Sequence, residues 1–307
     1  MQPLSTACSP QTWLVTGASG LIGTALCKHL LVQGHEVRVL SRSRAFEMVG
    51  STSFVWDVSN KVFPSEALHG VHHVVHLAGA NVGQRWTPAH KANVLKSRTE
   101  GTALLANALA QADFSGTFIQ ASAIGLYGEC EHAGESTLKG EGFLSDVTAA
   151  WESSAKGLLP EGARHVTMRI GLVLSDQGGT LEKLLPIYRL GLGAPLGSGR
   201  QWMSWIHLDD VVRFVVHAAS DPHVVGPHNL VAPEPVTNQA FSQALARTLS
   251  RPHFAPAVPA FALKLAMGEM ASLLLLSQHV VPENLHRLGF AWTAGHLDDA
   301  LERCVKG

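Results

Sequence analysis

The stretch "VTGASGLIG", residues 15–23, decides the fold of this chain. Its first residues end the apolar run "TWLVT" (12–16), and a second apolar run, "EVRVL" (36–40), follows after a helical pattern. Glycines at this spacing permit a tight turn, a close backbone approach to a pyrophosphate and close packing of helix on strand. The stretch therefore predicts a strand, a phosphate-binding turn and a helix whose first N–H groups face the phosphate charge.

Further apolar runs continue this alternation of strands and helices. The runs that read as strands are continuously apolar or β-branched, as expected of a parallel sheet covered on both faces. They span residues 53–58, 72–79, 117–122 and 165–174. Helical patterns occupy 88–112 and 237–249. This series of strand–helix–strand units predicts an α/β fold with a doubly wound parallel sheet of Rossmann type.

The regular pattern loosens after residue 175, where the stretch "GLGAPLGSG" (191–199) is rich in Gly and Pro. We therefore predict a cofactor-binding domain over residues 11–232, with substrate-side segments from about 178–204. The remaining region, 233–307, is predicted to complete the substrate side. Its tail, from residue 252 onward, is predicted to form a separate helical appendage.

Two segments bear on membrane insertion and export. The most apolar run, 257–276, is interrupted by Lys264 and Glu269, so it predicts a buried or surface-packed helix rather than a membrane span. The first twelve residues, "MQPLSTACSPQT", have neither a basic nor an apolar region of the kind found in signal peptides. We therefore expect a cytoplasmic protein without a membrane partner.

Charge and cysteine usage exclude several classes of protein. Lys and Arg number 23 and Asp and Glu 24, and this balance gives no reason to expect a nucleic-acid partner. The cysteines are Cys8, Cys27, Cys130 and Cys304. They have no paired spacing, which argues against a disulfide framework or a thiolate zinc site. His72 and His76 would share one strand face but lack further ligands, so no metal is expected.

The end of the second strand, "VLSRSR" (39–44), indicates the cofactor. NAD sites usually place an acid here to bind the ribose 2′-hydroxyl, whereas this chain has Ser41 and Arg42, with Arg44 nearby. Because a guanidinium pairs well with a phosphate, NADP(H) is favoured. The residues expected to contact it are Gly17, Ser19, Gly20, Leu21, Ile22, Gly23, Ser41, Arg42, Asp57, Leu77, Ala78, Gly79 and Arg98.

Several motifs resemble the extended short-chain dehydrogenases/reductases. They are "TGASGLIG" (16–23), "HLAGA" (76–80), "SAIGLYG" (122–128) and "WIHLDDV" (205–211). The later stretches "RIGLVLS" (169–175) and "GEMASLLLLSQHVVPENLHRLGF" (268–290) resemble one atypical branch of that family, described as epimerase-like or sugar-nucleotide-epimerase-like. The resemblance covers essentially residues 12–302.

The resemblance implies a catalytic Ser, a Tyr and, four residues after the Tyr, a Lys. Ser122 matches the Ser, but the Tyr–Lys pair falls at Trp151 and Ala155. These two residues lie in "AAWESSAKG" (149–157), which reads as a helix opening and would turn both toward a nicotinamide. Trp151 would then form an apolar wall, with Ala155 leaving the room that the Lys would have filled. Tyr127 matches a different family tyrosine, normally a pocket residue. The candidates for proton delivery are Tyr127, which we favour, Ser122 and water.

Other residues concern the substrate side. Enzymes of the family that act on sugar nucleotides carry an Arg for the substrate diphosphate, at the position that Met203 holds here, and Arg200 is out of register. The residues expected to line the substrate pocket are Arg85, Trp86, Trp151, Trp202 and Met203. Glu152 is expected to cap or pair locally. His207, Asp209 and Asp210 are expected to serve mainly a structural role.

Three functions stay open from the sequence. The first is an NADP(H)-dependent oxidoreductase acting on a small substrate that the sequence does not identify. The second is a non-catalytic NADP(H)-binding sensor or scaffold. The third, a nucleotide-sugar epimerase, is opposed by Met203, Trp151 and Ala155. Whether the chain is an enzyme without the Tyr–Lys pair, and whether it forms a homodimer, are also left open.

Overall fold

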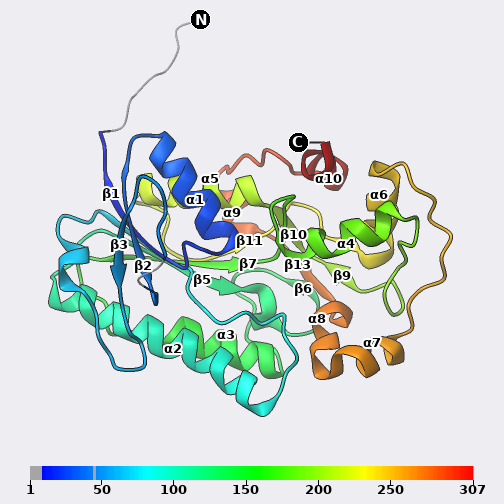
Figure 1. Cartoon of the computed structure of the whole chain (residues 1–307), viewed down its shortest axis with the longest axis horizontal. Helices are drawn as coiled ribbons and strands as arrows, with labels where there is room; N and C mark the ends of the chain where they lie inside the picture. The colour runs from blue at the N-terminus through cyan, green and yellow to red at the C-terminus, as the bar shows by residue number, and fades with distance from the viewer. Residues whose placement is uncertain (1–8, 44–45, 307) are drawn as a thin grey trace, which may run out of the picture.

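The computed structural model describes residues 9–43 and 46–306, so Cys8 and Arg44 lie outside the described residues. A central sheet lies between two layers of helices, and further helices and short strands gather at one end of the molecule (Figure 1). The doubly wound α/β fold predicted from the sequence is confirmed.

Seven strands form the central sheet in the described part of the chain, and all neighbours run parallel. Their order is β11-β7-β5-β4-β1-β2-β3. They are β1 (Thr12–Thr16), β2 (Glu36–Ser41), β3 (Thr52–Val55), β4 (His73–His76), β5 (Thr117–Ala123), β7 (Arg164–Ile170) and β11 (Gly226–Leu230). Because the chain changes direction across the sheet between β1 and β4, a crevice forms beyond their carboxyl ends, where such folds bind ligands.

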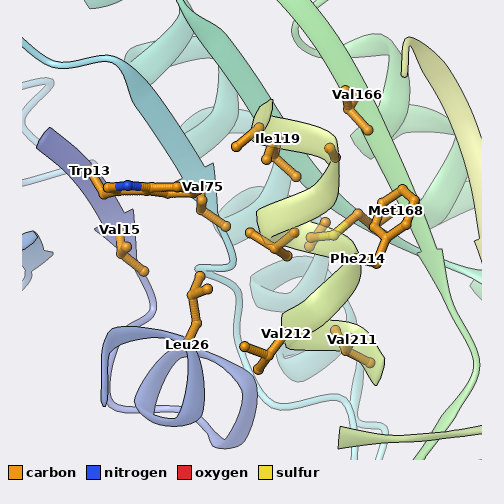
Figure 2. Packing of buried hydrophobic residues seen from close by; sticks show 14 of the residues in the cluster. Trp13, Val15, Leu26, Val75, Ile119, Val166, Met168, Val211, Val212 and Phe214 are labelled. Atoms are coloured by element: carbon orange, nitrogen blue, oxygen red, sulfur yellow. The ribbon is translucent and has the colours of Figure 1, made fainter. Parts of the chain in front are cut away.

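Helices cover both faces of this sheet (Figure 1). One face carries α1 (Leu21–Val32) and α5 (Leu208–Ser220), and the other carries α2 (Pro88–Gln111) and α3 (Phe143–Ser153). Side chains of α1 and α5 meet those of the sheet in one cluster (Figure 2). Its members include Trp13, Val15, Leu26, Val75, Ile119, Val166, Met168, Val211, Val212 and Phe214. Burial of this cluster positions the strand ends that carry the site.

The remaining elements are short. Those before β7 are η1 (Ser65–Leu68), η2 (Ile124–Tyr127) and β6 (Cys130–Ala133). Those between β7 and the tail are β8 (Leu172–Leu174), α4 (Gly179–Arg189), β9 (Trp202–Met203), β10 (Trp205–His207), β12 (Val236–Thr237) and α6 (Asn238–Thr248). The tail contributes α7 (Ala260–Met267), η3 (Gly268–Ala271), α8 (Ser272–Leu275), β13 (Gln278–Val280), α9 (Glu283–Arg287) and α10 (Leu297–Lys306).

The tail is helical, as predicted, and it packs against the rest of the chain. Strand β13 pairs with β6, and α9 and α10 pack against β11 and α6. The carboxylate of Asp210, in the first turn of α5, accepts hydrogen bonds from the backbone N–H groups of Thr293 and Ala294. His207 caps the same helix by accepting from the N–H of Asp209, so this segment has the structural role expected of it.

The apolar run 257–276 differs from the expectation of one buried or surface-packed helix. It forms the three short elements α7, η3 and α8, and both Phe261 and Leu265 on α7 are exposed. No helix in the described residues is both long enough and apolar enough to span a membrane.

Two further local predictions were wrong. The strand expected over 165–174 is divided at Gly171 into β7, which pairs with β5 and β11, and β8, which pairs with β10. A Cβ on Gly171 would lie only 2.6 Å from the carbonyl oxygen of Ser204, so glycine is needed at this point. The stretch 149–157 closes helix α3 instead of opening a helix. The side chains of Gln120 and Ser154 both donate to the carbonyl oxygen of Trp151, which satisfies the last turn and ends the helix.

Candidate cofactor and active site

The glycine turn after β1 brings two strand ends together. Gly17 adopts a φ of 71°, and a Cβ there would lie 2.8 Å from the carbonyl carbon of Leu77 at the end of β4. A Cβ on Gly23 would lie 2.3 Å from the carbonyl oxygen of Gly17. Only glycine fits either position, so helix α1 is held tightly against the turn, as a dinucleotide site requires.

The N-terminus of α1 opens into a cavity of about 240 Å³. The cavity is lined by Ser19, Gly20, Leu21, Thr24, Gln177, Gly178 and Gly179. Gly20 is the N-cap residue and offers no side chain to cap the helix. The first N–H groups of α1 therefore face a cavity wide enough for phosphate oxygens, and the residues present fit a dinucleotide cofactor.

The residues expected at the adenosine end follow β2 and β3. Arg42 is exposed directly after β2, and Ser41 is half-buried at the end of that strand. Asp57 is engaged by its own turn, where its carboxylate accepts from the backbone and side chain of Asn60. The side-chain hydrogen bond from Asn60 is the main cause that lowers the pKa of Asp57.

A polar cluster lies at the carboxyl ends of β5 and β7. Ser122 donates to Oε1 of Glu152 over 2.5 Å. Arg169 donates from Nε to the same oxygen at 2.8 Å and from Nη2 to Oε2 at 2.9 Å. Ser122 and Arg169 are register partners on adjacent strands, and Glu152 reaches both from α3. The sequence expectation that Glu152 pairs locally did not identify these partners.

The sequence contains a feature that could have identified Arg169 as a residue of the site. It is a charged residue inside a run that reads as a buried strand, and buried charges need partners. The structure shows that partner as Glu152, whose two hydrogen bonds raise the pKa of Arg169 against the opposing effect of burial. Which carboxylate would pair with it could not be read from spacing.

Tyr127 belongs to the same network but has no free hydrogen. Its hydroxyl donates to Oδ1 of Asn229 at 2.7 Å and accepts from Nη1 of Arg169 at 2.8 Å. The residue is 2% exposed, and burial raises its pKa. The hydrogen bonds of its hydroxyl and its raised pKa both oppose proton donation by Tyr127. The geometry therefore favours Ser122 over Tyr127 as the group that exchanges a proton.

Ala155 does not leave the open room that was expected beside Trp151. Helix α3 ends before Ala155, which is fully buried in a cluster with α2 residues such as Leu109, so it leaves no open room. Trp151 is 6% exposed, and the guanidinium of Arg98 stacks on its ring at 4.9 Å. Its indole Nε1 is buried with no hydrogen-bond partner among the described residues.

The residues expected to line one substrate pocket are distributed over different parts of the structure. Trp86 stacks edge-on against Phe143 and lines a cavity of about 620 Å³ with Lys91 and Lys264. The remaining expected residues do not line this cavity. Trp151 is buried under Arg98, and Trp202 and Met203 form strand β9, which pairs with β12. Arg85 lies near Gly268, at the edge of the Trp86 cavity.

His72 and His76 hold neighbouring parts of the structure together. His76 lies between the hydroxyls of Thr16 and Thr102, at 2.7 and 3.0 Å, and burial lowers its pKa to about 3. His72 precedes β4 and accepts from the backbone N–H of Thr12. Within residues 9–43 and 46–306, no group of His, Cys, Asp and Glu side chains could hold a metal ion.

Comparison with known proteins shows the family to which this chain belongs. A family model described as the NAD dependent epimerase/dehydratase family matches residues 13–149, and a domain of unknown function, DUF1731, matches residues 258–304. The epimerase family protein Mb2239 of Mycobacterium bovis is 40% identical over 293 residues, which cover 94% of this chain and 95% of that protein. The chain belongs to the epimerase family. DUF1731 coincides with the tail that carries α7 to α10.

Solved structures support the assignment of this chain to the epimerase family. A crystal structure of the human epimerase family protein SDR39U1 with NADPH is 32% identical, has a TM-score of 0.87, and covers 97% of this chain and 100% of that one. A nucleoside-diphosphate sugar epimerase from Corynebacterium glutamicum is 31% identical with a TM-score of 0.78, and the match covers 97% of this chain and 58% of that one. The resemblance to an atypical branch of extended short-chain dehydrogenases/reductases is confirmed.

Proposed function

We propose that this epimerase-family protein is an NADP(H)-dependent oxidoreductase in which Ser122 and Glu152 together exchange the substrate proton. The observation that carries the proposal is their 2.5 Å hydrogen bond, made at the carboxyl edge of the sheet. Oxidation of an alcohol, or reduction of a carbonyl, needs a group that takes or gives the proton on oxygen. The bound cofactor would supply the hydride chemistry.

The choice of NADP(H) rests on the residues after β2. Ser41 and Arg42 stand where an acid would bind the ribose 2′-hydroxyl of NAD, and the exposed guanidinium of Arg42 suits a 2′-phosphate. The human family member crystallised with NADPH supports the same choice. The glycine turn and the N-terminus of α1 would hold the pyrophosphate.

The proton follows a short path in the oxidising direction. The substrate hydroxyl loses its proton to Oγ of Ser122, while Ser122 passes its own proton to Oε1 of Glu152. A carbonyl double bond would form as the hydride leaves with the electron pair of the C–H bond, and NADP⁺, when bound, would accept that hydride. Arg169 holds both carboxylate oxygens and so keeps Oε1 directed at Ser122. Reduction of a carbonyl runs this path backwards.

Turnover of a generic carbonyl probe tests this proposal. The purified protein is mixed with NADPH and phenanthrenequinone, and NADPH consumption is followed for wild type, Ser122→Ala and Glu152→Gln. Loss of a general acid–base typically costs about 10²–10⁴-fold in rate, and we expect both variants to lose activity in that range. Glu161→Gln removes an exposed carboxylate shortly after α3 and serves as the matched control.

Binding measurements separate the possible failures. Calorimetric titration should show that Ser122→Ala and Glu152→Gln bind NADPH within about threefold of wild type, since neither residue is assigned to cofactor binding. A wild-type protein that binds NADPH but turns over no carbonyl probe would support the non-catalytic sensor or scaffold instead. Equal turnover in wild type and Glu152→Gln would remove Glu152 from the proton path.

A further inference from the structure

The Trp86 cavity is formed by parts of the chain that are far apart in the sequence. One part is the loop after β4 with the first turns of α2 and α3, and the other is the tail, through α7, η3 and α8. The lining residues are Trp86, Lys91, Phe143, Lys264, Gly268, Glu269 and Ser272. The segment matched by DUF1731 therefore completes this cavity, whose volume of about 620 Å³ suits a small molecule.

This cavity is separate from the cluster that exchanges the substrate proton. Among the described residues, its lining includes neither Ser122 nor Glu152. Phe143 is the first residue of α3 and Glu152 lies near the end of the same helix. At about 1.5 Å per residue, roughly 14 Å of helix separates them. A group bound in the cavity is therefore held at a distance from Ser122, and the lining itself must indicate its chemistry.

Two aromatic rings give the cavity an apolar wall. Trp86 and Phe143 meet edge-on, with their ring centroids 5.0 Å apart. The indole Nε1 of Trp86 donates to the carbonyl oxygen of Val82 at 2.9 Å, which holds the ring in place and leaves no indole hydrogen for a ligand. These rings favour a flat, apolar ligand surface over a highly hydroxylated one.

The charges around the cavity are not balanced. The ammonium of Lys91 pairs with the carboxylate of Glu269 and lies 5.2 Å from the ring centroid of Phe143. Lys264 is exposed, and within the described part of the chain no hydrogen bond or ion pair engages its ammonium. The lining therefore has one net positive charge, which Lys264 provides. Such a charge beside an apolar wall attracts an anion.

We propose that the Trp86 cavity binds a planar aromatic molecule that carries one acidic group. The rings of Trp86 and Phe143 contact its apolar body, and the ammonium of Lys264 pairs with its acidic group. Lys91 is already paired with Glu269, so it serves mainly to hold α2 against the tail. Neither NADP(H) nor Ser122 takes part in this binding, so the proposal can fail or succeed independently of the proposed function.

Two fluorescent probes that differ by one charge test this proposal. The first, 8-anilinonaphthalene-1-sulfonate, is an aromatic anion, and N-phenyl-1-naphthylamine is the same molecule without the sulfonate. Each is titrated without NADPH into wild type, Lys264→Met and Glu269→Gln. We expect Lys264→Met to bind the sulfonate about three- to fivefold more weakly, as for an exposed ion pair, and the neutral probe equally well. Glu269→Gln raises the net positive charge and should bind the sulfonate more tightly, an effect that a damaged cavity would not produce.

Two further variants locate the probes on the protein. Trp86→Leu removes an aromatic wall and should weaken both probes. Phe261→Ala is the matched control, because Phe261 is exposed on α7 but does not line the cavity, and both affinities should stay unchanged.

Two results would overturn the proposal. Binding that depends on Phe261 and not on Trp86 would place the probes on the exposed face of α7. Equal affinity of wild type and Lys264→Met for the sulfonate would show that Lys264 does not bind the acidic group. Since Lys264 is exposed, its replacement leaves the fold intact and decides the question even if Trp86→Leu is unstable.

Discussion

Oε1 of Glu152 lies 2.5 Å from the Ser122 hydroxyl and 2.8 Å from Nε of Arg169. One carboxylate oxygen thus joins a serine at a strand end to a buried cation. Trp151, the preceding residue, stands where the family resemblance places the tyrosine. Because each helical residue turns about 100° from the last, Glu152 faces β5 and β7 while Trp151 faces Arg98. Trp151 thus lacks the polar group that the family resemblance implies at its position, and the neighbouring Glu152 brings a carboxylate to the site.

Tyr127→Phe should lower stability rather than cofactor affinity. The variant leaves the Nη1 donor of Arg169 and the Oδ1 acceptor of Asn229 short of one buried partner each. We expect a loss of roughly 1–3 kcal/mol in the free energy of unfolding, measured with denaturant, and NADPH binding within a few-fold of wild type. A large loss of carbonyl turnover with unchanged stability would contradict this prediction and indicate that Tyr127 donates the proton.

Arg42→Ala should remove most of the preference for NADPH over NADH. A guanidinium hydrogen bond to the 2′-phosphate is worth about 10–150-fold in affinity, and the exposure of Arg42 places the expected value in the lower half of that range. Calorimetric titration of both cofactors should show NADPH about tenfold weaker in the variant and NADH nearly unchanged. Equal affinities for the two cofactors in wild type would show that Arg42 does not read the phosphate.

The protein should lose stability as the pH falls below the usual pKa of histidine. Burial lowers the pKa of His76 from 6.5 to about 3, so between these values the unfolded chain binds a proton that the folded chain does not. The unfolding free energy should then fall by up to about 1.4 kcal/mol per pH unit for this one group. Denaturant unfolding at several pH values tests this against His76→Gln, in which the slope should be smaller by about one proton; an identical slope would contradict it.

Nucleotide sugars should not be epimerised or dehydrated by this protein. Met203 stands at the position of the diphosphate-binding Arg, and its sulfur accepts a hydrogen bond from Asn238 inside the β9–β12 region. The tyrosine and lysine positions hold Trp151 and Ala155. Incubation of the wild-type protein with UDP- and dTDP-sugars, followed by product analysis, should show no measurable conversion. Robust turnover of any of them would revive the epimerase reading.

The glycine turn and its strands could be predicted from the sequence because their causes are local. Gly17 and Gly23 lie close together in the sequence and contact each other in the same turn. The apolar residues of β1 by themselves indicate a buried strand. The same local reasoning failed where a distant contact decides the structure. The expected strand is divided at Gly171 because β7 and β8 pair with different partner strands, and α3 ends at Ser153, where the distant Gln120 donates to its last turn.

The candidate site divides in the same way. The sequence by itself determined a dinucleotide-binding turn, Ser41 and Arg42 after β2, and a serine at the end of β5. Only the tertiary structure decided that Ser122, Glu152 and Arg169 meet, because the register of β5 on β7 and the rotation of α3 set those distances. Local backbone preferences act over a few residues, whereas the partner of a buried charge is chosen by packing between elements that the chain brings together from far apart.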